Sequence, residues 1–292
     1  MTQLHRRTAV LAVLAILLAA IPAAAQTVRT FSVPGATHTR AFGINPSGEI
    51  VGIYVSGPIF RGFRLNGEEM IEIDYPGALV TSALKINPQG DVVGWYGFTT
   101  TTFHGYLLRN GTYSSFDVPG AANTLPFGIN AAGDIVGAYL NADGVFHGFL
   151  LRDGEITHID FPGAVLTQAV DISSTGDILG VYRTADGNFH MFLFSEGTFS
   201  SVDYPGAVWT GASAIGVGIN PRGEIVGQYR DAVGVTHGFV LNADGYATVD
   251  LSGCAVTVLT GINPRGDITG RCRGADGRDV AFVMDAKRKQ LR

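Results

Sequence analysis

The sequence is poor in cysteine, in charged residues and in amphipathic helical patterns. It has only 2 cysteines in 292 residues, too few for a small domain held together by many disulfides. Charged residues make up 15% of the chain and the net charge is −5, so there is no basic surplus for binding nucleic acid. After residue 25 no segment keeps a 3.6-residue apolar period, which argues against a helical fold.

The one long apolar run lies at the N-terminus. Arg6 and Arg7 precede an apolar stretch over residues 9–21, and alanines at 23–25 supply the small side chains that signal peptidase requires. We predict a signal peptide over residues 1–25, cleaved before Gln26; an uncleaved membrane anchor is the alternative. We therefore expect a secreted protein, extracellular or periplasmic, with no membrane span after cleavage.

Glycine, by contrast, is abundant, and two markers recur in phase to define six copies of a repeat. Forty glycines among many β-branched and aromatic residues indicate short strands and tight turns. The first marker, Pro-Gly-Ala, starts at Pro34, Pro76, Pro119, Pro162 and Pro205, with Ser252-Gly253-Cys254 as a variant. The second, Gly-Ile-Asn and its variants, contains Ile44, Ile86, Ile129, Ile172, Ile219 and Ile262.

Each copy is predicted to form four antiparallel strands, a to d, and the repeat length of about 43 residues is typical of a propeller blade. The chain after the signal peptide begins with an unpaired strand d, residues 27–33, and the sixth copy ends after strand c, residues 280–284. The first strand supplies what the last blade lacks, as in a closed ring. We predict an all-β, six-bladed β-propeller over residues 26–286, monomeric, followed by a basic tail over 287–292.

The repeat also resembles the secreted, propeller-like HAF repeats of bacteria, which carry a His-Ala-Phe motif and strand segments similar to GINxxGxIVG. The resemblance covers residues 27–285. This chain has His-Gly-Phe at 147–149 and 237–239, His-Gly-Tyr at 104–106 and His-Met-Phe at 190–192. The resemblance implies an extracellular repeat protein, and it brings no established reaction and no catalytic residues.

In each complete c–d hairpin a cation-capable residue precedes an aspartate by thirteen positions. These pairs are Arg61/Asp74, His104/Asp117, His147/Asp160, His190/Asp203 and His237/Asp250. Val280 and Ser32 replace both partners in the closing blade. We interpret the pairs as structural cross-strand contacts, with the aspartate on strand d directly opposite its partner, because four copies around a ring cannot converge on one substrate. Separate His/Asp metal sites, one per blade, are the alternative.

We expect no cofactor and no metal. The loops at 141–144 and 184–187 hint at calcium, but one or two acidic groups fall short of the six to eight oxygens that calcium takes. They are predicted to be b–c turns.

Function is expected where the repeat departs from its pattern. Lys85 and Asp171 replace the glycine before Ile on strand a, so we expect them to face the channel. The d–a loops, expected on the same side as the channel mouth, add four candidate ligand contacts, His38, Arg40, Gln168 and Trp209. These residues predict a binding module for an extracellular glycan or protein. The alternatives are a polysaccharide lyase or hydrolase with Lys85 and Asp171 as acid and base, or a purely structural envelope protein.

The two cysteines are predicted to form a disulfide. Cys254 takes a position that is alanine in the other repeats, and Cys272 takes one that is tyrosine. If that tyrosine normally packs on that alanine, a disulfide would replace the contact in the sixth repeat. Two buried free thiols are the alternative.

Overall fold

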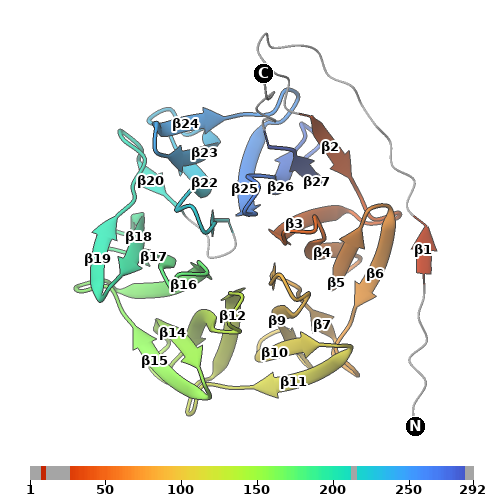
Figure 1. The fold of residues 1–292 in the computed structure, drawn as a ribbon, viewed down its shortest axis with the longest axis horizontal. Coiled ribbons are helices and arrows are strands. Elements are labelled where there is room, and N and C mark those ends of the chain that lie inside the picture. Colours follow the sequence, from red (N-terminus) through yellow and green to blue (C-terminus); the bar gives the residue numbers. More distant parts are fainter. Residues whose placement is uncertain (1–7, 11–26, 212–215, 287–292) are drawn as a thin grey trace.

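The computed structural model describes residues 8–10, 27–211 and 216–286. These residues form six antiparallel sheets in a ring, with no helix among them (Figure 1). The predicted six-bladed β-propeller is confirmed. The predicted cleavage site before Gln26, most of the predicted signal peptide and the basic tail lie outside the described residues. The described part of the chain contains no helix long and apolar enough to cross a membrane.

In blades 1, 3, 4 and 6, strand a is continuous. Blade 1 consists of β3 (His38–Ile44), β4 (Ile50–Ser56), β5 (Ile59–Asn66) and β6 (Glu69–Ile73). Blade 3 consists of β12 (Asn123–Ile129), β13 (Ile135–Leu140), β14 (Phe146–Arg152) and β15 (Glu155–Ile159). Blade 4 consists of β16 (Leu166–Ile172), β17 (Ile178–Arg183), β18 (Phe189–Ser195) and β19 (Thr198–Ser201). Blade 6 consists of β25 (Val256–Ile262), β26 (Ile268–Arg273), β27 (Asp279–Met284) and β2 (Val28–Phe31).

In blades 2 and 5, strand a is split into two short segments that both pair with strand b. Blade 2 consists of β7 (Val80–Thr81), β8 (Lys85–Ile86), β9 (Val92–Gly97), β10 (His104–Arg109) and β11 (Thr112–Phe116). Blade 5 consists of β20 (Trp209–Thr210), β21 (Gly218–Ile219), β22 (Ile225–Arg230), β23 (Thr236–Asn242) and β24 (Gly245–Val249).

The ring closes as the sequence predicts. Strand β2 pairs antiparallel with β27, with Val28 opposite Met284 and Phe31 opposite Ala281, so the N-terminal strand completes the C-terminal blade (Figure 1). A further strand, β1 (Thr8–Val10), pairs with β6 at the outer edge of blade 1. Closure gives the sixth sheet its fourth strand and pairs β27 on both of its sides.

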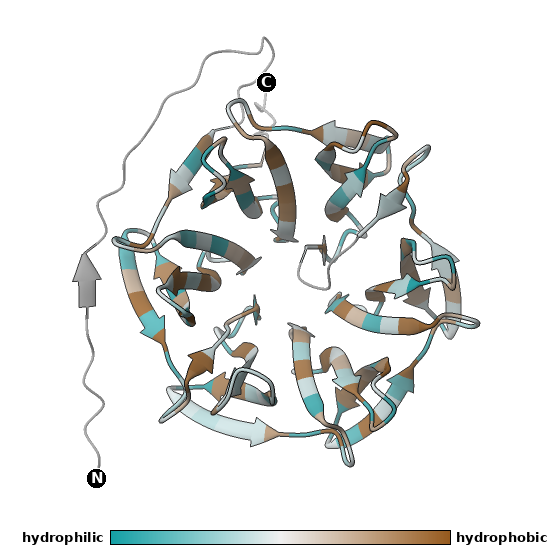
Figure 2. Cartoon of the chain, turned by 180° about the vertical axis from the view of Figure 1, so that it is seen from behind, coloured by the Kyte–Doolittle hydropathy of each residue, from teal (hydrophilic) through white to brown (hydrophobic). Residues whose placement is uncertain are grey.

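Each blade is built around one aromatic ring on strand c and one glycine on strand b. The fully buried rings are Phe63, Tyr106, Phe149, Phe192, Phe239 and Phe282. A Cβ on Gly137 would lie 2.6 Å from the Phe149 ring and 2.3 Å from the carbonyl oxygen of Leu125. Only glycine therefore lets strand a and the ring approach strand b this closely. Figure 2 shows bands of apolar and polar residues along the strands.

A threonine at the start of each strand a joins consecutive blades. Its hydroxyl accepts a hydrogen bond of 2.9–3.0 Å from the backbone N–H six residues earlier, just before the Pro-Gly marker. The six threonines are Thr39, Thr81, Thr124, Thr167, Thr210 and Thr257. All are buried, so their recurrence in the sequence has a structural cause.

Candidate functional site

The partners of each predicted His/Asp pair are in contact, on the outer half of the blades. The distance from His Nδ1 to the carboxylate is 2.8 Å in His104/Asp117, 3.1 Å in His147/Asp160, 2.8 Å in His190/Asp203 and 2.8 Å in His237/Asp250. In blade 1, Arg61 Nε lies 3.1 Å from Asp74. The strand-b tyrosine stacks on the histidine in three blades, with ring centroids 5.1–5.4 Å apart, so each of these imidazoles is held on one face and at Nδ1.

The aspartates, however, lie just beyond the end of strand d, so the prediction that they belong to that strand is wrong. The register of the ladder, continued past its last pair, still places each aspartate opposite its partner on strand c. Asp117 follows the last residue of β11, Phe116, and Asp203 lies two residues after the end of β19 at Ser201. The last paired residues of strands c and d come one position before the His/Asp pair. In blade 3, for example, Gly148 is opposite Ile159 in that last pair. The chain leaves the sheet there because the Pro-Gly turn follows within three residues.

The carboxylates therefore contact strand c from the loop that follows strand d. Each contact holds strands c and d together just past their last backbone hydrogen bond. The side chain of Asp117 is 47% exposed and that of Asp203 is 32% exposed. Asp203 also accepts a hydrogen bond of 3.0 Å from the backbone N–H of Met191, a donor that strand d does not reach. The contacts cap the end of the sheet, just beyond its last ladder pair, and their structural role stays our prediction.

His237 differs from the other three histidines because it lies between two carboxylates. Its Nε2 is 3.3 Å from Asp231 and its Nδ1 is 2.8 Å from Asp250. Burial lowers the pKa of His237, but hydrogen bonds to Asp250 and Asp231 outweigh burial and raise it above its usual value. Within the described ranges, no three His, Cys, Asp or Glu side chains are grouped so that they could hold a metal ion.

The predicted disulfide is confirmed. Cys254 and Cys272 are bonded, with their Cα atoms 5.4 Å apart. In blades 2 to 5 the equivalent alanine and tyrosine share one apolar cluster, as Ala78 and Tyr96 do in blade 2. The covalent bond replaces that packing in blade 6.

The central channel is closed in its middle by apolar side chains. One residue of each strand a, just before the glycine position, projects toward the axis; these are Phe42, Leu84, Phe127, Val170, Val217 and Thr260. In the four continuous inner strands this residue is the extra one in a β-bulge, as Phe42 is between Ala41 and Gly43. The bulge re-aims the side chain into the channel.

Lys85 and Asp171 lie in the next layer, and they bind each other. Lys85 Nζ is 2.8 Å from Asp171 Oδ2, and the two side chains are 11% and 8% exposed. Lys85 Nζ also donates to the carbonyl oxygen of Thr260 at 3.2 Å. Asp171 accepts from the backbone N–H of Ile219 at 3.0 Å. The ion pair thus joins blades 2 and 4 across the axis and ties them to blades 5 and 6.

Beyond the ion pair the channel opens into a bowl that is exposed to solvent. Its wall is a ring of isoleucines, one per blade, namely Ile44, Ile86, Ile129, Ile172, Ile219 and Ile262. Its rim carries Pro46, Pro88, Pro221 and Pro264 from the a–b turns. Among the described residues that line it, only Lys85 and Asp171 are charged, and they lie at the floor.

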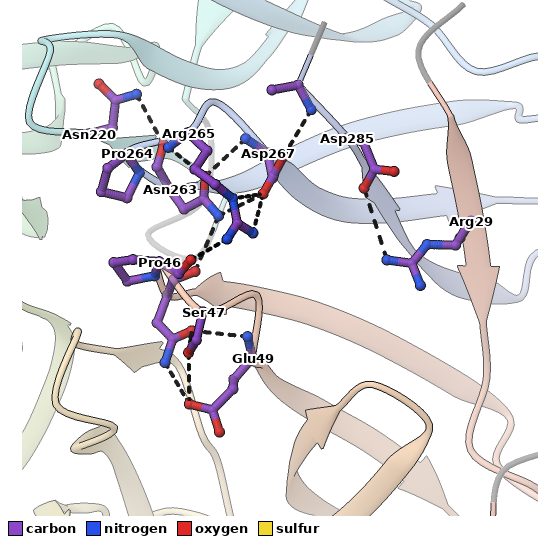
Figure 3. Close-up of polar contacts among 12 residues, drawn as sticks. Arg29, Pro46, Ser47, Glu49, Asn220, Asn263, Pro264, Arg265, Asp267 and Asp285 are labelled. Carbon is purple, nitrogen blue, oxygen red and sulfur yellow. Dashed lines mark hydrogen bonds and ion pairs between the residues drawn. The ribbon is translucent and has the colours of Figure 1, made fainter. Parts of the chain in front are cut away.

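Asparagines brace the rim from blade to blade (Figure 3). Asn263 Nδ2 donates to the carbonyl oxygen of Asn45 at 3.2 Å, and Asn220 Nδ2 donates to that of Asn263 at 3.2 Å. Arg265 donates to the carbonyl oxygen of Pro46 and also binds Asp267 (Figure 3). These bonds hold the bowl rigid around the axis.

The six predicted ligand contacts do not form one site. Strand a runs from the d–a loop to the a–b turn, so its two ends lie on opposite faces of the ring. Lys85 and Asp171 are at the bowl, on the a–b face. His38, Arg40, Gln168 and Trp209 are at the start of strand a, on the d–a face. The bowl therefore opens away from the d–a loops, contrary to the expectation that both share one side. Most of the insertion after Trp209 lies outside the described residues.

The sequence analysis missed three charged residues on the d–a face. Asp279 is contacted by Arg271 and Arg273, and also by Arg40 and His38, at the seam between blades 6 and 1. Aligning the repeats could have found them, because Asp279 takes a position that is phenylalanine in four other blades.

No protein-family model matches this chain, and no curated protein is similar to it in sequence. Similar solved structures exist. TolB from Acinetobacter baumannii superposes with a TM-score of 0.55 at 13% identity, over 82% of this chain and 64% of that one. A putative TolB from Agrobacterium tumefaciens gives 0.54 at 16% identity, over 85% and 90% of the two chains.

A point mutant of Aleuria aurantia lectin, solved in complex with Fucα1-6GlcNAc, superposes with a TM-score of 0.52. Its identity is 10%, over 85% of this chain and 91% of that one. What these proteins share with this chain is the propeller fold. At such low identity the likeness carries no site residues across.

Proposed function

We propose that this protein is a secreted binding module that holds its ligand in the bowl at the open end of the channel. The observation that carries the proposal is the Lys85–Asp171 ion pair. The charged side chains among the residues that line the bowl are bonded to each other, so the floor is a fixed, neutral surface beneath an apolar ring. A concave apolar site with few polar groups is the usual form of a ligand pocket.

The enzyme alternative is not favoured by this geometry. Most glycoside hydrolases use two carboxyl groups about 5–9.5 Å apart, which flank the scissile bond. Asp171 is the single carboxylate among the described residues that line the bowl. Lys85 would serve as a base only without its proton, whereas here its ammonium is held by Asp171 and a backbone carbonyl.

Several features support export. Disulfides persist in oxidising compartments, and Cys254 and Cys272 form one. The N-terminal sequence has the charge and apolar pattern of a signal peptide. The repeat resembles the HAF-type secreted repeats, and we propose that the chain belongs with them. The ligand classes that we propose are an extracellular glycan or a protein segment; among proteins of this fold, the Aleuria aurantia lectin is solved with a disaccharide.

The test is retention of the purified protein on arrays of immobilised glycans and peptides, using two matched variants. Ser174→Arg places a long charged side chain on the bowl rim, whereas Ser200→Arg makes the same change on an exposed outer strand. We expect ligand retention by the wild type and by Ser200→Arg, and its loss in Ser174→Arg. Equal retention by both variants would show that the bowl is not the binding site.

A further inference from the structure

A buried carboxylate with three arginines around it lies at the seam between blades 6 and 1. The Asp279 side chain has 0% exposure. Arg40 Nε is 2.7 Å from its Oδ2, Arg271 Nη1 is 3.1 Å from its Oδ1, and Arg273 Nε is 2.9 Å from its Oδ1. The four residues come from β3, β26 and β27, which lie side by side in Figure 1.

The other seams have apolar or neutral residues in these positions. The residues equivalent to Asp279 are Phe60, Phe103, Phe146, Phe189 and Thr236. The residues equivalent to Arg271 are Ile53, Trp95, Ala138, Val181 and Gln228. At the next seam the ring of Phe60 packs edge-on against Trp95, with centroids 5.2 Å apart. The closing seam therefore exchanges an aromatic contact for a charged cluster.

The cluster has more positive charge than its own structure requires. One arginine would neutralise Asp279, and the two others leave an excess of two positive charges in a chain whose net charge is −5. The side chains of Arg40, Arg271 and Arg273 are 27%, 20% and 39% exposed, so they are partly desolvated yet reachable from solvent. Partial burial of unneutralised cations is unfavourable unless an anion offsets them.

His38 completes the rim of the cluster as a hydrogen-bonding group. The backbone N–H of Asp279 donates to His38 Nδ1 at 3.1 Å. That nitrogen therefore accepts, which places the ring proton on Nε2, where it is a donor. His38, at the start of β3, thus adds a donor beside the three guanidinium groups.

We propose that this cluster is a binding site for an oxyanion, that is, a carboxylate, sulfate or phosphate group of an extracellular ligand. The guanidinium fork matches such groups with paired N–H donors. Asp279 holds the three forks in a fixed arrangement, and the disulfide at Cys272, between Arg271 and Arg273, anchors the strand that carries two of them. The site lies on the d–a face, at the opposite end of the channel from the bowl, and it does not depend on the proposed function of the bowl.

A purely structural latch at the closing seam is the competing explanation. A latch would need only one cation for the carboxylate, as in other ionic contacts of the ring, where one arginine meets one acid, such as Arg152 with Asp134 at 2.8 Å. It does not account for three arginines on one carboxylate. The two explanations differ in whether the arginines respond to added anions.

The test is a titration of the folded protein, at constant ionic strength in chloride, with D-galacturonate, sulfate and phosphate, and with neutral D-galactose as the control. Binding is followed by NMR through the arginine Nε–H signals. We expect saturable shifts of the Arg40, Arg271 and Arg273 signals with at least one anion and none with galactose. The anion that binds most tightly distinguishes a carboxylated ligand from a sulfated or phosphorylated one. Absence of saturable shifts with all three anions would overturn the proposal.

The second part of the test uses variants in which an arginine is replaced by the residue found at the equivalent position of another blade. Arg271→Gln and Arg40→Gln install the residues found at the equivalent positions, Gln228 and Gln168, and each should lower anion affinity by about tenfold. Arg230→Gln removes the same charge at the position equivalent to Arg273 in blade 5, and it should leave affinity unchanged. A similar loss in Arg230→Gln would show a diffuse charge effect and not a site.

Ser174→Arg, which adds a charged side chain at the bowl, should not alter anion binding. Failure of one proposal can therefore be told apart from failure of the other.

Discussion

At the scale of single residues, repetition separates structure from function in this molecule. The His/Asp contact recurs in four blades and becomes Arg61/Asp74 in a fifth, each time at the end of a c–d hairpin. A contact present five times around a ring serves each blade in the same way. Residues that occur once, such as Lys85, Asp171 and Asp279, are those that give the two faces of the channel their different chemistry.

Replacing His147 with alanine should therefore lower stability slightly and leave ligand retention unchanged. The loss of one exposed pair between neighbouring strands is expected to lower the free energy of unfolding by about 0.2–1 kcal/mol. Chemical denaturation measures it, and a double-mutant cycle with Asp160→Ala isolates the pair. A folded His147→Ala protein that no longer binds its array ligand would show that the histidines belong to the site.

Asp279 should give the protein an acid-sensitive seam. Burial alone would raise the pKa of this carboxyl, but Arg273, Arg271 and Arg40 hold it at about 2, below the ordinary 3.8. A lowered pKa means that the ionised form stabilises the fold above pH 4 and that this stabilisation, roughly 2 kcal/mol, is lost as the pH falls toward 2.

The Asp279→Asn variant should accordingly be less stable than the wild type at pH 7, with the difference shrinking below pH 4. Unfolding free energies at a series of pH values measure this gap. A constant difference from pH 7 to pH 2 would contradict a depressed pKa for Asp279.

At the scale of elements, the hairpin turns were predictable, whereas the ends of the outer strands and the bulges were not. The Asn110-Gly111 turn follows from its sequence, and its φ values of 50° and 78° are those of the two-residue turn that matches strand twist. The spacing of thirteen residues predicted that Asp117 contacts His104, but it did not show that strand d ends before the aspartate. That end depends on how the following Pro-Gly turn leaves the sheet.

The bulge at Phe42 leaves no local signal in the sequence, because it arises where six inner strands crowd around the axis. A Cβ on Gly43 would lie 3.0 Å from the Cα of Lys85 in the next blade. That crowding depends on the closed ring, which no single repeat encodes.

The disulfide should account for a measurable part of the stability of blade 6. It joins residues 18 positions apart, and closing such a loop contributes roughly 3 kcal/mol in the chain-entropy model. Cys254→Ala/Cys272→Tyr restores the pair found in the other blades and should recover part of that loss, whereas Cys254→Ala/Cys272→Ala should not. Thermal unfolding with and without reductant compares them. Equal stability of the reduced and oxidised wild type would contradict this role.

At the scale of the whole molecule, the repeat count and the offset of the first strand predicted the ring and its closure. The sequence did not reveal which residues meet across the channel. Lys85 and Asp171 are 86 positions apart and were expected only to face the channel, yet they form one ion pair. The cluster at Asp279 likewise joins Arg40 to a residue 239 positions away. Such contacts depend on the diameter of the ring and on its closing seam.

The Lys85–Asp171 ion pair should stabilise the contact between blades 2 and 4. Replacing only Lys85 with methionine, or only Asp171 with leucine, leaves a buried charge without its partner and should cost about 3–5 kcal/mol. The double variant Lys85→Met/Asp171→Leu should regain most of this loss, since it extends the apolar plug. Denaturation of the three variants measures the coupling, and additive losses would show that the two residues do not stabilise each other.

The most direct test of the account is to incubate the purified protein with a panel of polysaccharides and measure retention and product release together. The central claim is that the channel binds and does not catalyse, because the acid and base candidates among its described residues are bonded to each other. We predict retention of at least one polymer with no product released by the wild type. Product release by the wild type that disappears in a folded Asp171→Ala variant would contradict the account.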